Sequence, residues 1–203
     1  MRQKIGRVCM VLGALLILAA AALLAYNKWD ASRADKASQE VLGELEQTLN
    51  AAIEEKAKSD TVALQPELDP TQEMTVTELN GWDYIGYLSI PSIGLELPVM
   101  SEWSYPRLKI APCRQFGSSR TDDLVIAAHN YESHFGKLTS LTAGDSVTFT
   151  DMDGIVNEYV VNKVEVLDPH SVEEVEHSGY ALVLYTCTYG GKTRVTVFCD
   201  RAS

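Results

Sequence analysis

The residues best suited to chemistry lie in the segment ALVLYTCTYGGKTRVTVFCD, which covers residues 181–200. Two runs rich in valine, tyrosine and threonine flank a glycine pair, so the segment predicts a β-hairpin that reverses at Gly190 and Gly191. Cys187 ends the first run and Arg194 begins the second. Because the two strands of a hairpin are antiparallel, the turn brings the thiol and the guanidinium to the same end.

A thiol beside a guanidinium is suited to covalent catalysis. The thiolate is the attacking species, and a nearby positive charge favours it. An arginine stays charged and offers forked donors, so Arg194 could hold a substrate carbonyl or a developing oxyanion. An ordinary hairpin with a surface arginine and a half-buried cysteine fits these two residues equally well, and further evidence must come from elsewhere in the chain.

A thiol that attacks an acyl group normally needs a proton carrier, most often histidine. Of the four histidines, two lie in the polar stretch DPHSVEEVEH, which is typical of a surface segment. His129 ends the apolar run LVIAAH, and His134 follows in the loop YESHFGKL. A side chain at the end of a strand can face a cleft, so we favour His129 and keep His134 as the alternative. Asn130 or Asp200 could orient the imidazole.

Short runs of β-branched and aromatic residues follow Gly81 and must position these side chains. The runs are YIGYLSIP, LELPVM, DDLVIAAH, DSVTFTDM, NEYVVNKVEVL, ALVLYTC and RVTVFC. Several short strands separated by turn residues, with little helical periodicity between them, predict an all-β domain folded as one closed or nearly closed β-barrel. The segment HFGKLTSL could form one helical turn.

The N-terminal segment Val8–Ala25 carries no charge over eighteen residues. At a rise of about 1.5 Å per residue, a helix of this length spans the hydrocarbon core of a bilayer. Arg2, Lys4 and Arg7 precede it, which predicts a cytoplasmic N-terminus. A cleaved signal peptide is the alternative, but its apolar region is usually shorter, at about 7–15 residues. We expect an uncleaved signal anchor, with the rest of the chain outside the membrane.

The region after the anchor predicts a helix over residues 31–58, because Leu42, Leu45, Leu49 and Ile53 recur at spacings of three and four. Its apolar stripe is narrow, which favours a stalk over a self-association seam or a helix lying on the domain.

Proline and acidic residues then replace the periodicity over residues 59–80, as in a linker. The predicted organisation is therefore a cytoplasmic tip and transmembrane anchor (1–28), a helical stalk and linker (29–80) and a catalytic domain (81–203).

Charge restricts the class of partner. The whole chain has a net charge of −11, and the part beyond residue 28 carries 13 basic and 28 acidic residues. A domain this acidic is poorly suited to nucleic acid or to anionic lipid headgroups. A neutral or basic partner, such as a peptide or an amine, fits it better.

Cysteine usage points to a free thiol. Cys9 lies in the apolar segment, which leaves Cys113, Cys187 and Cys199 outside it. An odd number of exported cysteines implies that at least one is unpaired. Spacing alone leaves a disulfide between Cys113 and Cys199 as an alternative, and we expect both to be buried and reduced instead.

The motifs AAHN, HFGKL and LYTC occur in this order, and an arginine follows the cysteine by seven residues. Together they resemble the sortases, which are membrane-anchored cysteine transpeptidases of Gram-positive-type envelopes. The resemblance covers about residues 82–201 and includes YIGYLSIPSIGLELPV, which is similar to the family's first strands. It implies a closed eight-stranded sortase-type β-barrel with short helical turns, in agreement with the strand pattern. The residues after the histidine resemble class B members, and we expect a class B- or D-like enzyme.

The resemblance implies roles for matching positions. Cys187 would be the nucleophile, His129 the general acid and base, and Arg194 the group that positions the substrate and stabilises the oxyanion. Thr186 also matches the family pattern and, with Asn130, is expected to contact the substrate. The family usually has a threonine four residues before the nucleophile, where this chain has valine.

The reaction implied by the resemblance is amide exchange through a thioester. Family members cleave an LPXTG-like sorting signal near the C-terminus of a secreted protein and pass the protein to an amine of a peptidoglycan precursor or a pilin. No cofactor and no metal is expected, and neither is a nucleic-acid partner. The implied location is the cell membrane, with a single span and an extracellular catalytic domain. The alternatives are a hydrolytic cysteine peptidase on the same barrel and a non-catalytic membrane-anchored binding module.

Overall fold

The structure is a computed structural model that describes residues 2–59 and 70–202. Within these residues, the strands are β1 (Thr77–Leu79), β2 (Trp82–Ile90), β3 (Leu95–Met100), β4 (Cys113–Phe116), β5 (Leu124–Ala128), β6 (Ser146–Asp151), β7 (Val156–Leu167), β8 (Leu182–Cys187) and β9 (Arg194–Arg201). The helices are α1 (Arg2–Ser59), α2 (Tyr105–Leu108) and α3 (Val172–Glu176), with 3₁₀ turns η1 (Pro91–Ile93) and η2 (Phe135–Ser140). The helical turn predicted from HFGKLTSL is η2.

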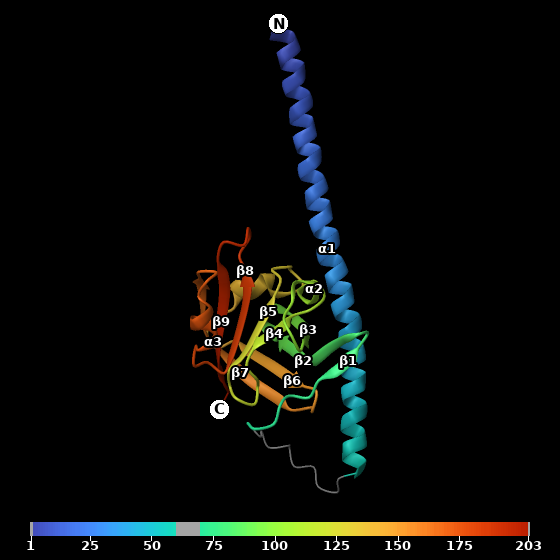
Figure 1. The fold of residues 1–203 in the computed structure, drawn as a ribbon, viewed down its shortest axis with the longest axis vertical. Helices are drawn as coiled ribbons and strands as arrows, with labels where there is room; N and C mark the ends of the chain where they lie inside the picture. The colour runs from blue at the N-terminus through green and yellow to red at the C-terminus, as the bar shows by residue number, and fades with distance from the viewer. Residues whose placement is uncertain (1, 60–69, 203) are drawn as a thin grey trace.

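The strands form one closed sheet. Their order is β1-β2-β3-β4-β5-β8-β9-β7-β6, and an additional pairing of β2 with β6 closes the ring. Strands β2 to β9 therefore make the predicted eight-stranded barrel (Figure 1). Strand β1 is an addition: it pairs with the first residues of β2, whereas β6 pairs with β2 from Gly86 to Ser89. The predicted linker over residues 59–80 therefore contains one short strand that the sequence did not reveal, because three residues are too few to show the alternation of a strand.

A β-bulge lets β2 change neighbours along its length. The register of β2 against β3 shifts between Tyr84 and Gly86. Gly86 has a φ of 148°, and a Cβ there would stand 2.1 Å from the backbone oxygen of Thr150 on β6. Only glycine therefore allows β6 to approach β2 closely enough to close the barrel.

Apolar side chains that alternate along the strands fill the barrel. The burial pattern of β7 begins exposed–buried over three repeats, as expected for a strand with one face on the core. The interior includes Leu184 from β8, Val197 and Cys199 from β9, and Ile126 from β5. This core fixes the register of the three strands that later carry the candidate site.

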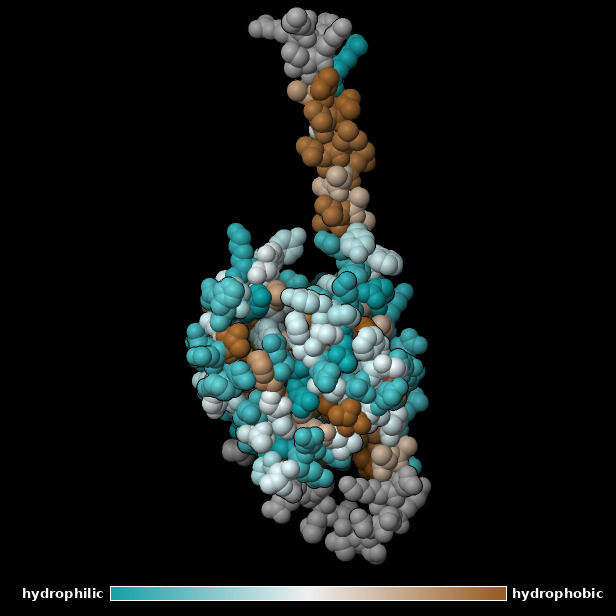
Figure 2. Space-filling view, viewed as in Figure 1, coloured by the Kyte–Doolittle hydropathy of each residue, from teal (hydrophilic) through white to brown (hydrophobic). Residues whose placement is uncertain are grey.

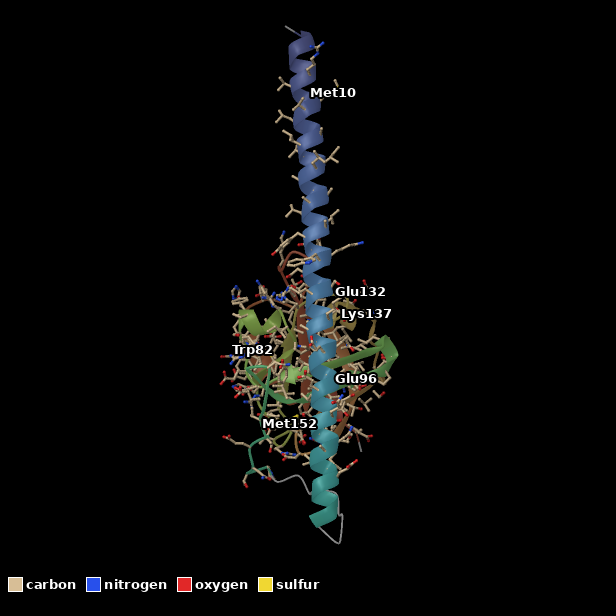
Figure 3. All side chains as sticks on the ribbon, turned by 90° about the vertical axis from the view of Figure 1, so that its right-hand side faces the viewer. Met10, Trp82, Glu96, Glu132, Lys137 and Met152 are labelled. Atoms are coloured by element: carbon tan, nitrogen blue, oxygen red, sulfur yellow. The ribbon has the colours of Figure 1, made fainter. Side chains whose placement is uncertain are left out.

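Helix α1 is continuous, and its two halves have different surroundings. The N-terminal half projects from the barrel and is apolar (Figures 1 and 2), and it is long and apolar enough to cross a membrane. The C-terminal half lies along the barrel beside β3, with Glu96 next to it in Figure 3. Val41, Leu42, Leu45 and Leu49 are buried there.

The predicted helix over residues 31–58 is therefore present, but the structure does not support a free stalk. The helix lies on the domain, because its narrow stripe of leucines removes apolar surface from water only when the barrel covers it.

All four cysteines lie among the described residues, and none forms a disulfide. Cys113 and Cys199 are fully buried, as predicted, and burial raises the pKa of both thiols to about 12. They are therefore unreactive packing residues. Cys187 is only half-buried, which leaves it as the accessible thiol of the barrel.

Candidate active site

The strands β5, β8 and β9 are neighbours in the sheet and carry the candidate residues at one end. Cys187 of β8 lies directly opposite Arg194 of β9. Strand β5 runs parallel to β8, and the last pair of their register is Ala128 with Thr186. His129 directly follows the last residue of β5, and Cys187 directly follows Thr186 as the last residue of β8. Neighbouring strands lie about 4.8 Å apart, so the backbone brings all three residues together.

Alternation also places Cys187 and Arg194 on a common face. Val183 and Phe198, which are paired across β8 and β9, belong to an apolar cluster outside the barrel interior. Cys187 is four residues from Val183, and Arg194 is four residues from Phe198. With a side-chain period of two, both point to the outer face of the sheet.

The same argument places His129. Val125 of β5 belongs to the outer cluster, whereas Ala128 belongs to the interior core. A residue that continues the alternation after Ala128 faces outward. His129 therefore shares both the end and the face of the sheet with Cys187 and Arg194.

The turn between β8 and β9 holds the arginine. Nη1 of Arg194 donates to the backbone oxygens of Gly191 and Thr193, each at 3.1 Å. Gly191 in turn donates its N–H to the oxygen of Thr188 at 2.8 Å, and its φ of 73° is in the left-handed region. The cation is thus fixed to the hairpin and leaves other N–H groups for a ligand.

The structure separates the two candidate histidines by burial. His129 is half-buried, and burial lowers its pKa, although the charge of Asp30 partly opposes this effect. His134 has no exposed surface, and burial lowers its pKa from 6.5 to about 4. Among the described residues, neither ring nitrogen of His134 has a hydrogen-bond partner. His129 is therefore the better placed proton carrier.

The buried His134 predicts a loss of stability in acid. At high pH both the folded and the unfolded chain hold it neutral. As the pH falls below 6.5, His134 binds a proton in the unfolded chain, whereas in the folded chain it stays neutral until about pH 4. At about 1.4 kcal/mol per tenfold change in proton affinity, the folded state loses at most about 3 kcal/mol.

Denaturant unfolding of the chain in micelles at pH 7.5 and at pH 4.5 measures this loss. The difference between the two pH values should be smaller in His134→Phe than in the parent chain. An equal difference in both proteins would contradict the assignment of His134 as a buried neutral group.

The other predicted site residues have different surroundings. The hydroxyl of Thr186 is buried and donates to the backbone oxygen of Ala128 at 2.8 Å, which ties β8 to β5 just before His129. Asn130 is exposed beside His129. Asp200 lies near the other end of β9, where it accepts a hydrogen bond from Asn162, so it does not orient the imidazole.

A cleft of about 170 Å³ begins at Arg194 and Tyr185 on the outer face. Its walls are mostly apolar and come from three regions outside the hairpin: Trp103, Gln115, Phe116, Leu167, Asp168, Pro169, Ser171, Val172 and Val175. The Tyr185 hydroxyl hydrogen-bonds the side chain of Gln115 across the cleft. A second cleft of about 370 Å³ shares Trp103, Gln115 and Phe116 with the first, so the two form one groove.

The groove was not predicted from the sequence. Its walls come from β4, the end of β7 and α3, which are brought together only by the closed barrel. The one available signal was the aromatic and apolar character of Trp103, Phe116 and Val172 in otherwise polar surroundings. In the described part of the chain, no group of three or more histidine, cysteine or acidic side chains forms a metal-ligand cluster.

The barrel agrees with the comparison to known proteins. The family model of the sortase domain matches residues 88–202, which is more than half of the chain. The chain belongs to the sortase family. It is 30% identical to sortase A of Bacillus anthracis over 129 residues, which are 61% of this chain and 60% of that protein. The chain therefore spans less than two thirds of the length of this relative.

Solved structures show the same fold. Sortase C of Streptococcus pneumoniae is 24% identical, with a TM-score of 0.58 over 81% of this chain and 97% of that chain. A sortase D5 transpeptidase of Clostridium perfringens is 20% identical, with a TM-score of 0.59 over 83% and 99% of the two chains. The eight-stranded sortase barrel expected from the motifs is confirmed.

Proposed function

We propose that this sortase is a cysteine transpeptidase that cleaves an LPXTG-like sorting signal and transfers the secreted protein to an amine. One observation carries the proposal: the strand register puts Cys187, His129 and Arg194 on one face, at one end of three adjacent strands. A nucleophile, a proton carrier and a fixed cation are the three groups that acyl transfer at a thiol requires.

The first half of the reaction forms a thioester. His129 takes the proton of Cys187, and the thiolate attacks the carbonyl carbon of the scissile amide. Arg194 stabilises the oxyanion of the tetrahedral intermediate through its remaining N–H groups. His129 then returns its proton to the leaving nitrogen, the C–N bond breaks, and the C-terminal fragment departs as an amine.

The second half resolves the thioester. An acceptor amine attacks the same carbonyl carbon and loses its proton to His129. The second tetrahedral intermediate collapses, the C–S bond breaks, and the proton returns to the Cys187 sulfur. Atoms and charges balance without a cofactor, and the products are a new amide and free enzyme.

The groove supports recognition of an extended, partly apolar peptide. It starts at Arg194, and its first part is lined by Phe116, Leu167, Val172 and Val175. Apolar residues upstream of the scissile bond would fit between these side chains, with the reacting carbonyl at Arg194. The class B- or D-like assignment remains a prediction, since the solved structures described above represent classes C and D.

The proposed location is the cell membrane, with the N-terminal half of α1 as a single-span anchor. In Figure 1, the β8–β9 turn lies at the end of the barrel nearest to the projecting half of α1, which Figure 2 shows to be apolar. The site would then face the membrane surface. Secreted proteins held by a C-terminal sorting signal, and peptidoglycan precursors or pilins that supply the amine, are the proposed partners.

The test is the fate of a sorting-signal peptide with and without an added amine. A transpeptidase forms the amide of the added amine at the expense of hydrolysis, and the ratio of amide to acid rises with amine concentration. A hydrolytic peptidase gives the acid alone at every amine concentration, and that result would overturn the proposal. A binding module gives neither product.

The role of Arg194 predicts a specific loss of kcat. Arg194→Lys keeps the charge but loses the planar guanidinium whose N–H groups bond the turn. Removing an oxyanion donor costs about 10²- to 10³-fold in kcat. We expect a loss of this size, with a much smaller change in KM. The nearby Lys192→Ala, on the same exposed turn, is the matched control and should retain kcat. Steady-state kinetics with a quenched sorting-signal peptide measures both; equal losses would assign Arg194 to the turn alone.

A further inference from the structure

A polar contact joins helix α1 to the loop that follows His129. The hydroxyl of Tyr131 donates to Oδ2 of Asp30 at 2.6 Å, across 101 positions of the sequence. The other carboxylate oxygen, Oδ1, accepts from Nη2 of Arg33 at 3.1 Å. Only 18% of the Asp30 side chain is exposed. The carboxylate is thus held at both oxygens, and it fixes the tyrosine hydroxyl to the helix.

The ring of Tyr131 packs against His129. Their ring centroids are 4.9 Å apart at an interplanar angle of 38°, and the Tyr131 ring also lies 5.4 Å from that of the buried His134. Ring pairs at this separation attract each other beyond the area that they bury. Tyr131 therefore limits the space on one side of the His129 imidazole.

The backbone of this loop has little freedom to move. The oxygen of Tyr131 accepts from the N–H groups of His134 and Gly136, each at 2.9 Å. A Cβ at Gly136 would stand 2.7 Å from the backbone oxygens of Asn130 and Tyr131, so the loop closes only on glycine. These contacts set the backbone position of Tyr131 and so keep its ring beside the imidazole of His129.

His129 has no other orienting group in the described part of the chain. No hydrogen bond from residues 2–59 or 70–202 reaches its ring, and Asp200, which the sequence suggested, is at the other end of β9. A catalytic base is normally oriented by a third group. Here the ring of Tyr131 packs against the imidazole, and the hydrogen bond to Asp30 holds Tyr131 in turn.

We propose that Asp30 and Tyr131 are positioning residues for His129, so that the anchor helix α1 supplies part of the active-site architecture. The inference rests on the proposed function, because it needs His129 to be the proton carrier. Asp30 is the fifth residue after the uncharged segment Val8–Ala25. The orientation of the imidazole therefore depends on how the membrane-proximal part of α1 lies on the barrel.

The charge of Asp30 has a second effect, which is on the pKa of His129. The groups that act on or contact His129 are Asp30 from α1, Lys109 at the end of α2, and Tyr131 and His134 from its own loop. Cys187 of β8 lies at the same end of the sheet. Burial lowers the pKa of His129, Asp30 raises it and Lys109 lowers it. Without the Asp30 charge, the pKa of His129 should fall further below 6.5.

The contact is not needed to hold the helix on the barrel. The buried leucine stripe of α1 fastens it to β3, and a second carboxylate of α1 makes a similar bond away from the site. Glu44 accepts from Nδ2 of Asn80 at 2.8 Å through Oε2. Glu44→Gln therefore makes the same chemical change as Asp30→Asn, on the same helix, and serves as the matched control.

The experiment uses the full chain in lipid nanodiscs with a quenched sorting-signal peptide and a fixed amine. We expect Asp30→Asn and Tyr131→Phe each to lower kcat by about tenfold with KM unchanged, because a small misplacement of a reacting group is costly. Glu44→Gln should stay within about twofold of the parent. The double variant of Asp30 and Tyr131 should lose no more than the worse single variant, since both act through one contact.

Histidine-selective NMR of the same proteins provides a readout that does not depend on activity. The His129 ring resonances should titrate at lower pH in Asp30→Asn than in the parent, and unchanged in Glu44→Gln. Equal losses of kcat in Asp30→Asn and Glu44→Gln would overturn the inference, as would full activity of Asp30→Asn. His129→Gln separates the two proposals: if it is inactive while Asp30→Asn is fully active, the inference alone fails. If His129→Gln is itself fully active, the proposed function fails first.

Discussion

Replacing Cys187 with alanine is expected to abolish transfer of a sorting-signal peptide to an amine, with a loss of about 10³-fold or more. The change removes the sulfur that we propose forms the thioester, and the other two thiols of the described barrel, Cys113 and Cys199, are buried. The fold should survive, since Cys187 lies half-buried at the end of β8 and outside the barrel core. Product formation followed by chromatography, with circular dichroism and the thermal midpoint of each protein, measures both expectations.

Cys199 supplies the matched control. It lies in the barrel core, fully buried and five residues beyond Arg194 on β9. Cys199→Ser places a hydroxyl in apolar surroundings, which costs about 1–3 kcal/mol of stability if the hydroxyl finds no partner. Activity at a temperature below the midpoint should be retained. Activity in Cys187→Ala equal to that of Cys199→Ser would refute the assignment of the nucleophile.

Replacing His129 with glutamine is expected to lower kcat for transfer by about 10²- to 10⁴-fold, the usual range for a general acid and base. Glutamine keeps the size and the polarity but cannot carry a proton between the thiol and the leaving amine. His177→Gln, which changes an exposed histidine beyond α3, should leave kcat unchanged.

The pH dependence of the transfer rate tests the same role of His129. Burial lowers the pKa of His129, so the limb of the pH–rate profile that this residue sets should lie below 6.5 in the parent chain. The same limb should be missing from the residual activity of His129→Gln. If the limb persists in that variant, another group carries the proton, and the roles assigned to this end of the barrel must be revised.

The meeting of Cys187 and Arg194 at one end of the barrel could be predicted because its signals are local. The thiol and the arginine are joined by a six-residue turn with two glycines, and such a hairpin is a short-range structure. His129 ends an apolar run, which marks the end of a strand. The pairing of β5 with β8 was beyond reach, since they are parallel and joined by a crossover that includes β6 and β7.

Other features that join distant segments of the chain could not be predicted either, because they too depend on the closed barrel. The groove collects side chains from β4, the end of β7 and α3, and no periodicity in the sequence shows which of these meet. The leucine stripe of α1 was visible, but its partner surface on β3 was not. The bond from Tyr131 to Asp30 crosses 101 positions and depends on the docking of α1 on the barrel. Thr186, expected to contact substrate, instead faces the interior because it alternates with Cys187.

The central claim is that one thiol of this chain carries the acyl group between donor and acceptor. Intact-mass spectrometry of the full chain after incubation with a pool of sorting-signal peptides, before and after addition of an amine, tests it directly. We expect a single adduct with the mass of the N-terminal peptide fragment, mapped to Cys187, absent from Cys187→Ala and discharged by the amine. Cleavage of the peptides with no adduct on Cys187, or adducts distributed equally over Cys113, Cys187 and Cys199, would contradict it.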